Sequence, residues 1–188
     1  MNRREALSSV ALLLGGTILG AEAFLSGCKT ASKDAIAFTP ADIELLSEIA
    51  ETILPATSTP GAKDAKVGEF MAVIVRDCYT PEERKAFTEG MKKIEEAAKA
   101  KHGKSFVAST KEQRHDLLVT LDSEAKAVQK NLKEKEMPHY FAMMKQLTLW
   151  GFFTSEVGAT KALRYVAVPG KYDGNFPYKK GDRAWATS

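Results

Sequence analysis

The stretch PHYFAMMKQLTLWGFF, residues 138–153, indicates a long helix that begins at Pro138 and is apolar on more than one side. A helix that is apolar nearly all round either lies at the centre of a bundle or is covered by another surface. The segment is too short to span a membrane, and Lys145 interrupts it near its middle. We therefore expect this helix either to be central to the bundle or to be covered by another surface. Its apolar positions are Phe141, Met144, Leu147, Leu149, Trp150 and Phe153.

Three further helices are predicted by their start signals. Thr39 and Thr80 each precede a proline, which suits the first turn of a helix, and Thr110 stands three residues before Gln113 in a capping box. Another apolar stripe runs from Val67 to Cys78, so we expect Cys78 to be a core residue. The buried positions that we expect on these helices are Ile43, Leu46, Ile49, Ala50, Ile53, Val67, Phe70, Met71, Ile74, Val75, Phe87, Met91, Ile94, Ala98, Leu117, Leu118, Leu121, Ala125 and Val128.

These patterns predict an all-α fold, a helical bundle of about five helices with an irregular aromatic C-terminal extension. Mixed charges line the helices, and pairs such as Asp122 and Lys126 have the spacing of neighbours on a solvated helix face. The expected organisation is a signal peptide over residues 1–27, a linker over 28–38, a helical domain over 39–163 and a C-terminal arm over 164–188.

The N-terminal residues have the order of an export signal. Arg3 and Arg4 precede an apolar run over residues 10–25, which resembles a twin-arginine signal. The run ends in Leu-Ser-Gly-Cys, similar to the lipobox of bacterial lipoproteins, and predicts acylation of Cys28. An ordinary membrane-spanning helix is the alternative, but Glu22 and three glycines interrupt it. We expect a protein held by lipid on the periplasmic side of a bacterial membrane.

Charge and cysteine content narrow the functional classes. The net charge of +3 belongs to residues 28–188, because the signal holds two arginines and two glutamates. This is too mild for nucleic-acid binding, and no dense basic cluster is present. The 161 residues beyond the signal suit one domain. With Cys28 acylated, Cys78 has no partner for a disulfide.

The sequence lacks the common catalytic motifs. Its histidines, His102, His115 and His139, do not share the spacing of a helical zinc site, and no dinucleotide, phosphate or covalent haem motif occurs. Ser155 lacks the flanking glycines of a hydrolase nucleophile, and we expect its hydroxyl to cap a helix. We therefore predict no catalytic, cofactor-binding or metal-binding residues in this chain.

The segment after residue 148 is rich in aromatic residues and in glycine and proline. Extended segments of this kind cannot cover their own rings, and Tyr and Trp supply much of the energy of protein interfaces. The C-terminal arm has a local charge of +3, which would suit an acidic groove on a partner. The alternative is that the arm packs on its own bundle. The predicted partner interface comprises Trp150, Phe152, Phe153, Tyr165, Tyr172, Phe176, Tyr178 and Trp185.

Two segments carry a family resemblance. Residues 44–84, ELLSEIAETILPATSTPGAKDAKVGEFMAVIVRDCYTPEER, and residues 144–178, MKQLTLWGFFTSEVGATKALRYVAVPGKYDGNFPY, resemble subunit 3 of the gluconate 2-dehydrogenase type of membrane-associated flavin dehydrogenases. Residues 54–61 and 151–174 are the most specific parts.

The resemblance implies an accessory role. It implies a large flavin-dependent dehydrogenase subunit as partner, which carries FAD and oxidises a sugar or sugar acid, and a cytochrome c subunit with haem c. The small subunit is expected to bind no cofactor and to assist maturation and export of the large one. Two other interpretations stay open: an enzyme with a site near His139, and a free-standing lipoprotein that binds a small ligand between its helices.

Overall fold

The computed structural model describes residues 37–133, 136–168, 170–171 and 173–186. The chain divides into two units, residues 1–35 and 36–188, and the described residues belong to the second. The export signal at Arg3 and Arg4, the lipidation site at Cys28 and the arm residue Tyr172 lie outside the described residues. Their predicted roles stay predictions.

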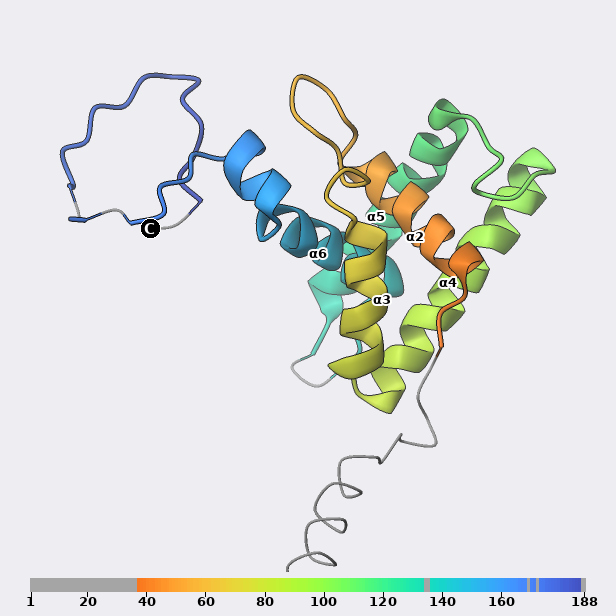
Figure 1. Ribbon diagram of the computed structural model, residues 1–188. Helices are drawn as coiled ribbons and strands as arrows, with labels where there is room; N and C mark the ends of the chain where they lie inside the picture. The colour runs from red at the N-terminus through yellow and green to blue at the C-terminus, as the bar shows by residue number, and fades with distance from the viewer. Residues whose placement is uncertain (1–36, 134–135, 169, 172, 187–188) are drawn as a thin grey trace, which may run out of the picture. The chain divides into compact units, whose positions relative to one another are not determined.

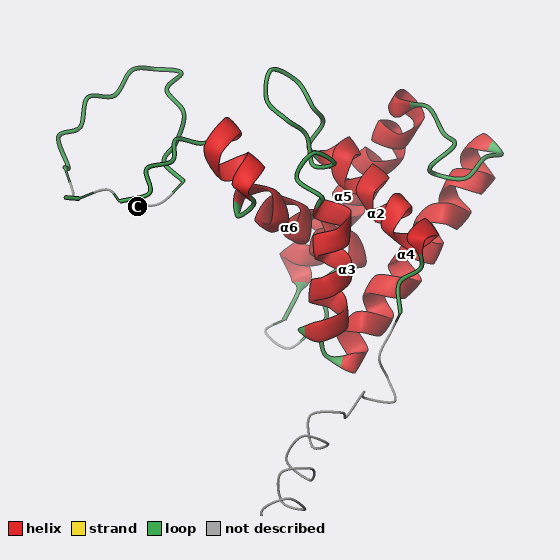
Figure 2. Ribbon diagram, viewed as in Figure 1, coloured by secondary structure: helices red, strands yellow, loops and turns green. Residues whose placement is uncertain are grey.

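The described residues form an all-α structure, as the sequence predicts (Figures 1 and 2). A single isolated β-bridge is the extended pairing found in them. None of the helices in these residues is both long and apolar enough to span a bilayer. The elements are α2 (Pro40–Ile53), α3 (Val67–Asp77), α4 (Pro81–His102), α5 (Lys111–Asn131), α6 (Tyr140–Phe153) and the π-helical turn η1 (Gly158–Ala162).

The predicted start signals fix the ends of three helices. The hydroxyls of Thr39, Thr80 and Thr110 each accept a hydrogen bond from the backbone three residues on, and in all three cases the side chain at that position returns a bond to the cap backbone. These capping boxes satisfy amides that the first helical turn leaves unpaired. Helix α4 ends at Gly103, whose φ of 68° is the left-handed conformation that glycine adopts most readily.

Helix α6 is the centre of the bundle, which confirms one of the two expectations for this segment. It contacts each of the four other α-helices, α2, α3, α4 and α5. Apolar side chains are therefore needed on most of its sides, which explains why its sequence has no clear polar face. Its buried residues are Phe141, Met143, Met144, Leu147, Thr148, Gly151 and Phe152.

The other helices supply the rest of the core, with two corrections to the prediction. Cys78 is exposed, because α3 ends at Asp77 and Cys78 forms its C-cap, where the chain turns toward α4. Val128 is also exposed, since the buried stripe of α5 ends at Ala125, before the last helical turns. The largest fully buried side chains are Phe87, Phe106, Leu46, Ile49, Met71, Ile94, Met144, Leu147, Val67, Val75 and Thr148.

Two glutamates of α2 hold the 54–66 loop and α5 in place. The Glu48 carboxylate forms ion pairs with Lys63 in that loop and with Arg114 on α5. One turn later, the Glu51 carboxylate accepts hydrogen bonds of 2.9 Å from the backbone amides of Ala56 and Lys63. The two carboxylates thus pair with cationic side chains and backbone amides that would otherwise be hydrogen-bonded to water.

Asp122 joins α5 to the central helix. Its carboxylate lies 2.7 Å from the Lys126 ammonium, as the helical spacing predicts, and 2.6 Å from the ammonium of Lys145 on α6. The hydrogen bonds from Lys126 and Lys145 lower the pKa of Asp122 below its ordinary value. The charge of Lys145, which breaks the apolar run of α6, is thus neutralised by a neighbouring helix.

Helices α2 and α3 approach closely at Gly68. A Cβ added to Gly68 would lie 2.2 Å from the Ser47 hydroxyl oxygen and 2.9 Å from the Ile43 carbonyl oxygen, both on α2. We predict that Gly68→Ala lowers the free energy of unfolding by about 1–3 kcal/mol, because forced backbone shifts exceed the gain of about 1 kcal/mol in helix propensity.

Chemical denaturation of the full chain measures this change, with Val73→Ala as the matched control. Val73 is exposed on the same helix, so its truncation is expected to change stability by less than about 0.5 kcal/mol. A Gly68→Ala variant as stable as the parent would show that α2 and α3 separate there without cost.

Candidate partner interface

One stripe of the central helix is left uncovered. Leu149, Trp150 and Phe153 lie within a little more than a quarter of the circumference of α6, and their exposed fractions are 40%, 51% and 40%. Phe152, which the sequence analysis placed in the same interface, is only 4% exposed and belongs to the core. That assignment is wrong, because Phe152 packs into the core, where its ring also meets that of Phe153 edge to face with centroids 5.1 Å apart.

Helix α3 borders the uncovered stripe through Phe70, which is partly buried against the core. The ring of Phe70 meets the ring of Trp150 edge to face, with centroids 5.6 Å apart and an interplanar angle of 86°. Gly151 permits this crossing, because a Cβ there would lie 2.5 Å from a ring atom of Phe70. Phe70, Leu149, Trp150 and Phe153 are called the α6 face below. Phe70 was expected in the core, and helical periodicity gave no sign of its contact with Trp150.

A short turn of helix follows α6 and is fixed by Ser155. The Ser155 hydroxyl accepts a hydrogen bond of 3.0 Å from the Gly158 amide and donates one of 2.6 Å to the Phe152 carbonyl. Its predicted capping role is confirmed. A Cβ on Gly158 would lie 1.9 Å from the Phe152 carbonyl oxygen, so this tight return requires glycine. The C-terminal arm therefore begins at a defined point.

The C-terminal arm returns to its own start (Figure 1). Backbone bonds of 2.8 Å join Arg164 to Ala184 and Ala186, and the guanidinium of Arg164 lies over the rings of Phe176 and Trp185. Tyr178 remains 76% exposed. Among the predicted interface rings of the arm, Phe176 and Trp185 contact each other and Arg164, and both remain about half exposed, as does Tyr165.

His139 has a structural task at the start of α6. Its Nδ1 atom accepts a hydrogen bond of 3.3 Å from the Phe141 amide, and its ring lies 4.2 Å from that of Tyr140. Burial lowers the pKa of His139; Lys93 acts in the same direction and Glu124 against it. A lowered pKa favours the neutral imidazole, which is the form that can accept at Nδ1.

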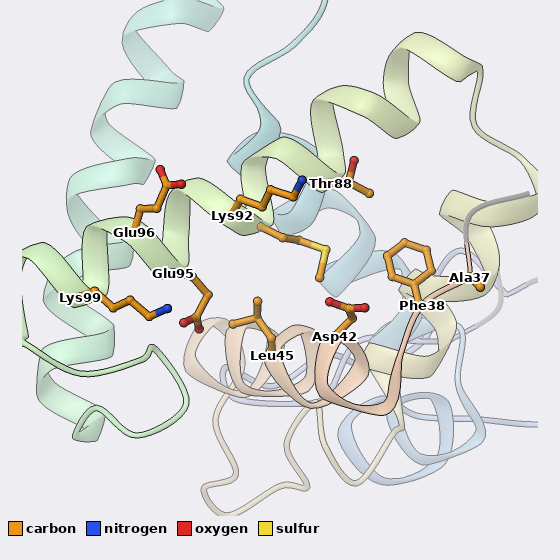
Figure 3. Close-up of a pocket in the computed structure, with 10 residues that line it drawn as sticks. Ala37, Phe38, Asp42, Leu45, Thr88, Lys92, Glu95, Glu96 and Lys99 are labelled. Atoms are coloured by element: carbon orange, nitrogen blue, oxygen red, sulfur yellow. The ribbon is translucent and has the colours of Figure 1, made fainter. Parts of the chain in front are cut away.

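A groove of about 380 Å³ lies between α2 and α4 (Figure 3). Two of its five charged side chains are engaged in the fold: Asp42 belongs to the capping box of α2, and Glu95 accepts a bond of 3.1 Å from the Phe106 amide. These bonds explain both carboxylates without a ligand. The groove is lined by Ala37, Phe38, Asp42, Leu45, Thr88, Met91, Lys92, Glu95, Glu96 and Lys99.

Within the described part of the chain, no three His, Cys, Asp or Glu side chains gather in a group that could hold a metal ion. The exposed features described above are aromatic rings on α6 and a basic, hydrogen-bonded C-terminal arm.

The fold and this surface define a small all-α protein with an aromatic face open to other polypeptides. The chain matches the family model described as gluconate 2-dehydrogenase subunit 3 over residues 40–170. It therefore belongs to that family, whose name describes one subunit of a multi-subunit dehydrogenase complex. Neither a curated protein nor a solved structure was found to match it.

We predict that His139 acts as a helix cap and not as a catalytic base. Asn also accepts at a cap, so His139→Asn should keep the stability within about 0.5 kcal/mol at pH 8, whereas His139→Ala should cost about 1 kcal/mol. The stability that neutral His139 contributes is complete above its unfolded pKa of about 6.5 and is lost as the pH falls. Thermal unfolding from pH 8 to pH 5 should therefore favour His139→Asn increasingly over the parent.

The alternative interpretation, in which His139 belongs to an enzymatic site, predicts that His139→Asn lowers the turnover of the dehydrogenase complex. If turnover falls while the subunit composition of the complex is unchanged, His139 has a role beyond the cap.

Proposed function

We propose that this chain is the non-catalytic accessory subunit of an exported, flavin-dependent sugar or sugar-acid dehydrogenase. It binds the large flavoprotein subunit, assists its maturation and carries it through the twin-arginine route. The electron path runs through FAD in the large subunit and haem c in a cytochrome subunit, and neither cofactor is bound by this chain. The family membership supports the role of a subunit.

The α6 face is the observation that carries the proposal. Trp150 is half exposed although it stands on the most central helix and is held edge to face by Phe70. A large ring that is fixed before binding loses little side-chain entropy in a complex, and Trp and Tyr dominate the binding energy of interfaces. An aromatic surface of this kind suits permanent contact with another folded chain.

Export and tethering follow from the N-terminal sequence. The twin-arginine route carries folded cargo, so the pair Arg3 and Arg4 on one subunit can serve a bound partner that has no signal of its own. Acylation of Cys28 would then hold the assembled complex on the periplasmic side of the membrane.

We predict that Trp150→Ala with Phe153→Ala weakens binding to the flavoprotein subunit by about thirtyfold or more, which corresponds to about 2 kcal/mol for a hot-spot residue. About half of each side chain is buried, so the isolated variant should lose some thermal stability, and circular dichroism must show that it is folded at the temperature of the binding measurement. Co-purification of the tagged chain with the co-expressed flavoprotein gives the measurement, and titration of the purified subunits gives the affinity.

The matched control is Val119→Ala with Val128→Ala. These valines are comparably exposed on α5, outside the α6 face, and their truncation should leave the complex intact. Equal recovery of flavoprotein with the Trp150 and Phe153 variant and with the parent would contradict the assignment of the α6 face.

We further predict that Arg3→Lys with Arg4→Lys leaves both subunits in the cytoplasm, because the conservative change keeps the charge but removes the arginine pair. Fractionation and flavin content of the periplasm provide the readout. As a control, a twin-arginine signal joined to the flavoprotein itself should restore its export. Normal flavoprotein export without the arginine pair on this chain would remove the escort role from the proposal.

A further inference from the structure

Arg164 holds the C-terminal arm closed. Its guanidinium carbon lies 4.6 Å from the centroid of the Trp185 ring and 5.5 Å from that of Phe176, and these two rings meet edge to face at 5.3 Å. Its Nη2 atom lies 3.6 Å from a carboxylate oxygen of Asp182. A planar cation that stacks on two rings and also pairs with a carboxylate holds together segments far apart in the sequence.

A second set of bonds shapes the exposed end of the arm. The Asp182 amide donates to the Lys179 carbonyl at 3.0 Å, and Gly181 has a φ of 96°, as in a type II turn. The Asp182 carboxylate also accepts a bond of 2.9 Å from the Lys179 amide. This turn presents Lys179 and Lys180 next to Tyr178, and all three side chains are exposed.

The charge that this turn presents is positive. Asp182 is already engaged by Arg164, while the ammonium groups of Lys179 and Lys180 extend from an exposed turn. The arm is also joined to the α6 face by a short link, since residues 154–163 connect the end of α6 to Arg164. A partner that covers the α6 face is therefore brought near the turn as well.

We propose that the C-terminal arm is a preassembled second docking element, in which the Tyr178-Lys179-Lys180 turn binds an acidic surface of the flavoprotein subunit and Arg164 is the positioning residue. This inference rests on the proposed function, because it names the second contact surface of the same complex. The arm adds to the affinity of the α6 face because both contacts belong to one chain, which raises the effective concentration of the second contact.

The contacts within the arm favour a protein partner over a membrane surface. Phe176 and Trp185, the rings best suited to enter a lipid interface, are held together by contact with Arg164 and with each other, although each remains about half exposed. The turn presents one Tyr between polar groups, and its backbone is fixed by hydrogen bonds. Fixed aromatic and basic groups are typical of interfaces with a folded partner of complementary charge.

Charge reversal at the turn tests the inference. Lys179→Glu with Lys180→Glu should lower the affinity for the purified flavoprotein about tenfold or more at 50 mM salt. The difference from the parent should shrink strongly near 1 M salt, where the Debye length falls to about 3 Å. Lys104→Glu with Lys111→Glu changes the net charge equally at exposed positions outside the arm, and should bind like the parent.

The outcomes separate the inference from the proposed function. If the turn variant binds like the parent while the Trp150 and Phe153 variant does not, the arm is not a docking element, and the proposed function stands. If the parent itself does not bind the flavoprotein, the proposed function fails. If the turn variant loses binding to vesicles of anionic phospholipid but keeps its affinity for the flavoprotein, the arm contacts a membrane and the inference is wrong.

Arg164 is tested with a spectroscopic readout. In a Trp150→Phe background, Trp185 is the one remaining tryptophan of the chain, so its fluorescence reports on the arm. Arg164→Ala should shift this emission to longer wavelength and increase quenching by iodide. In the chain with Trp150 intact, Arg164→Ala should weaken flavoprotein binding severalfold. Arg164→Lys should restore little of either, because an ammonium lacks the planar stack. Unchanged emission, or a fully open arm with unchanged binding, would overturn the positioning role.

Discussion

Burial of one helix by four others is the constraint on which this structure depends. Helix α6 touches α2, α3, α4 and α5, so side chains around most of its circumference meet another helix, and Leu149, Trp150 and Phe153 are the exposed exceptions. Its single positive charge, on Lys145, is matched by Asp122 of α5. An apolar helix of 14 residues could not remain in water without this cover, and the four outer helices are arranged to provide it.

The same arrangement holds the exposed residues of α6 in place. Leu149, Trp150 and Phe153 stand on a helix whose opposite side is fixed by Leu147 and Phe152 in the core. Edge-to-face contact with Phe70 restrains Trp150 further. These rings are therefore presented by a packed scaffold, and their contact surface needs little rearrangement before a partner binds. A mobile loop could offer the same residues only at a higher cost in conformational entropy.

Local sequence rules predicted the parts of this fold that depend on local contacts. The helix starts at Thr39, Thr80 and Thr110 and the Asp122–Lys126 pair depend on residues three or four apart, and each occurs where the sequence indicated it. The two wrong core predictions share one cause. Cys78 and Val128 continue an apolar stripe of their helix beyond the last residue that another helix covers. The periodicity of apolar residues does not show where that neighbouring helix ends.

Contacts across long sequence distances were beyond such rules. Glu95, which has the spacing of a pair with Lys99, instead accepts a bond from the Phe106 amide, and Glu48 pairs with Arg114 on a distant helix. Phe152 and Phe153 could not be told apart, because a helix that is apolar nearly all round offers no polar face from which to set its orientation.

The C-terminal arm is also held by contacts between residues far apart in the sequence, which local sequence rules do not predict. Its aromatic residues predicted an interface with a partner. In the structure, however, Phe176 and Trp185 contact Arg164, which is 12 and 21 residues away in the sequence. Glycine and proline disfavour a long helix in this segment, so helical backbone hydrogen bonds cannot hold it in one conformation. The cation–π contacts of Arg164 with the two rings stabilise its conformation instead. The Tyr178 side chain lies outside that cluster, beside two lysines.

The α6 face and the basic turn of the arm differ in the range of their interactions, because apolar rings act only in contact whereas charges act over about a Debye length. A basic turn can therefore orient an acidic partner before the α6 face is covered.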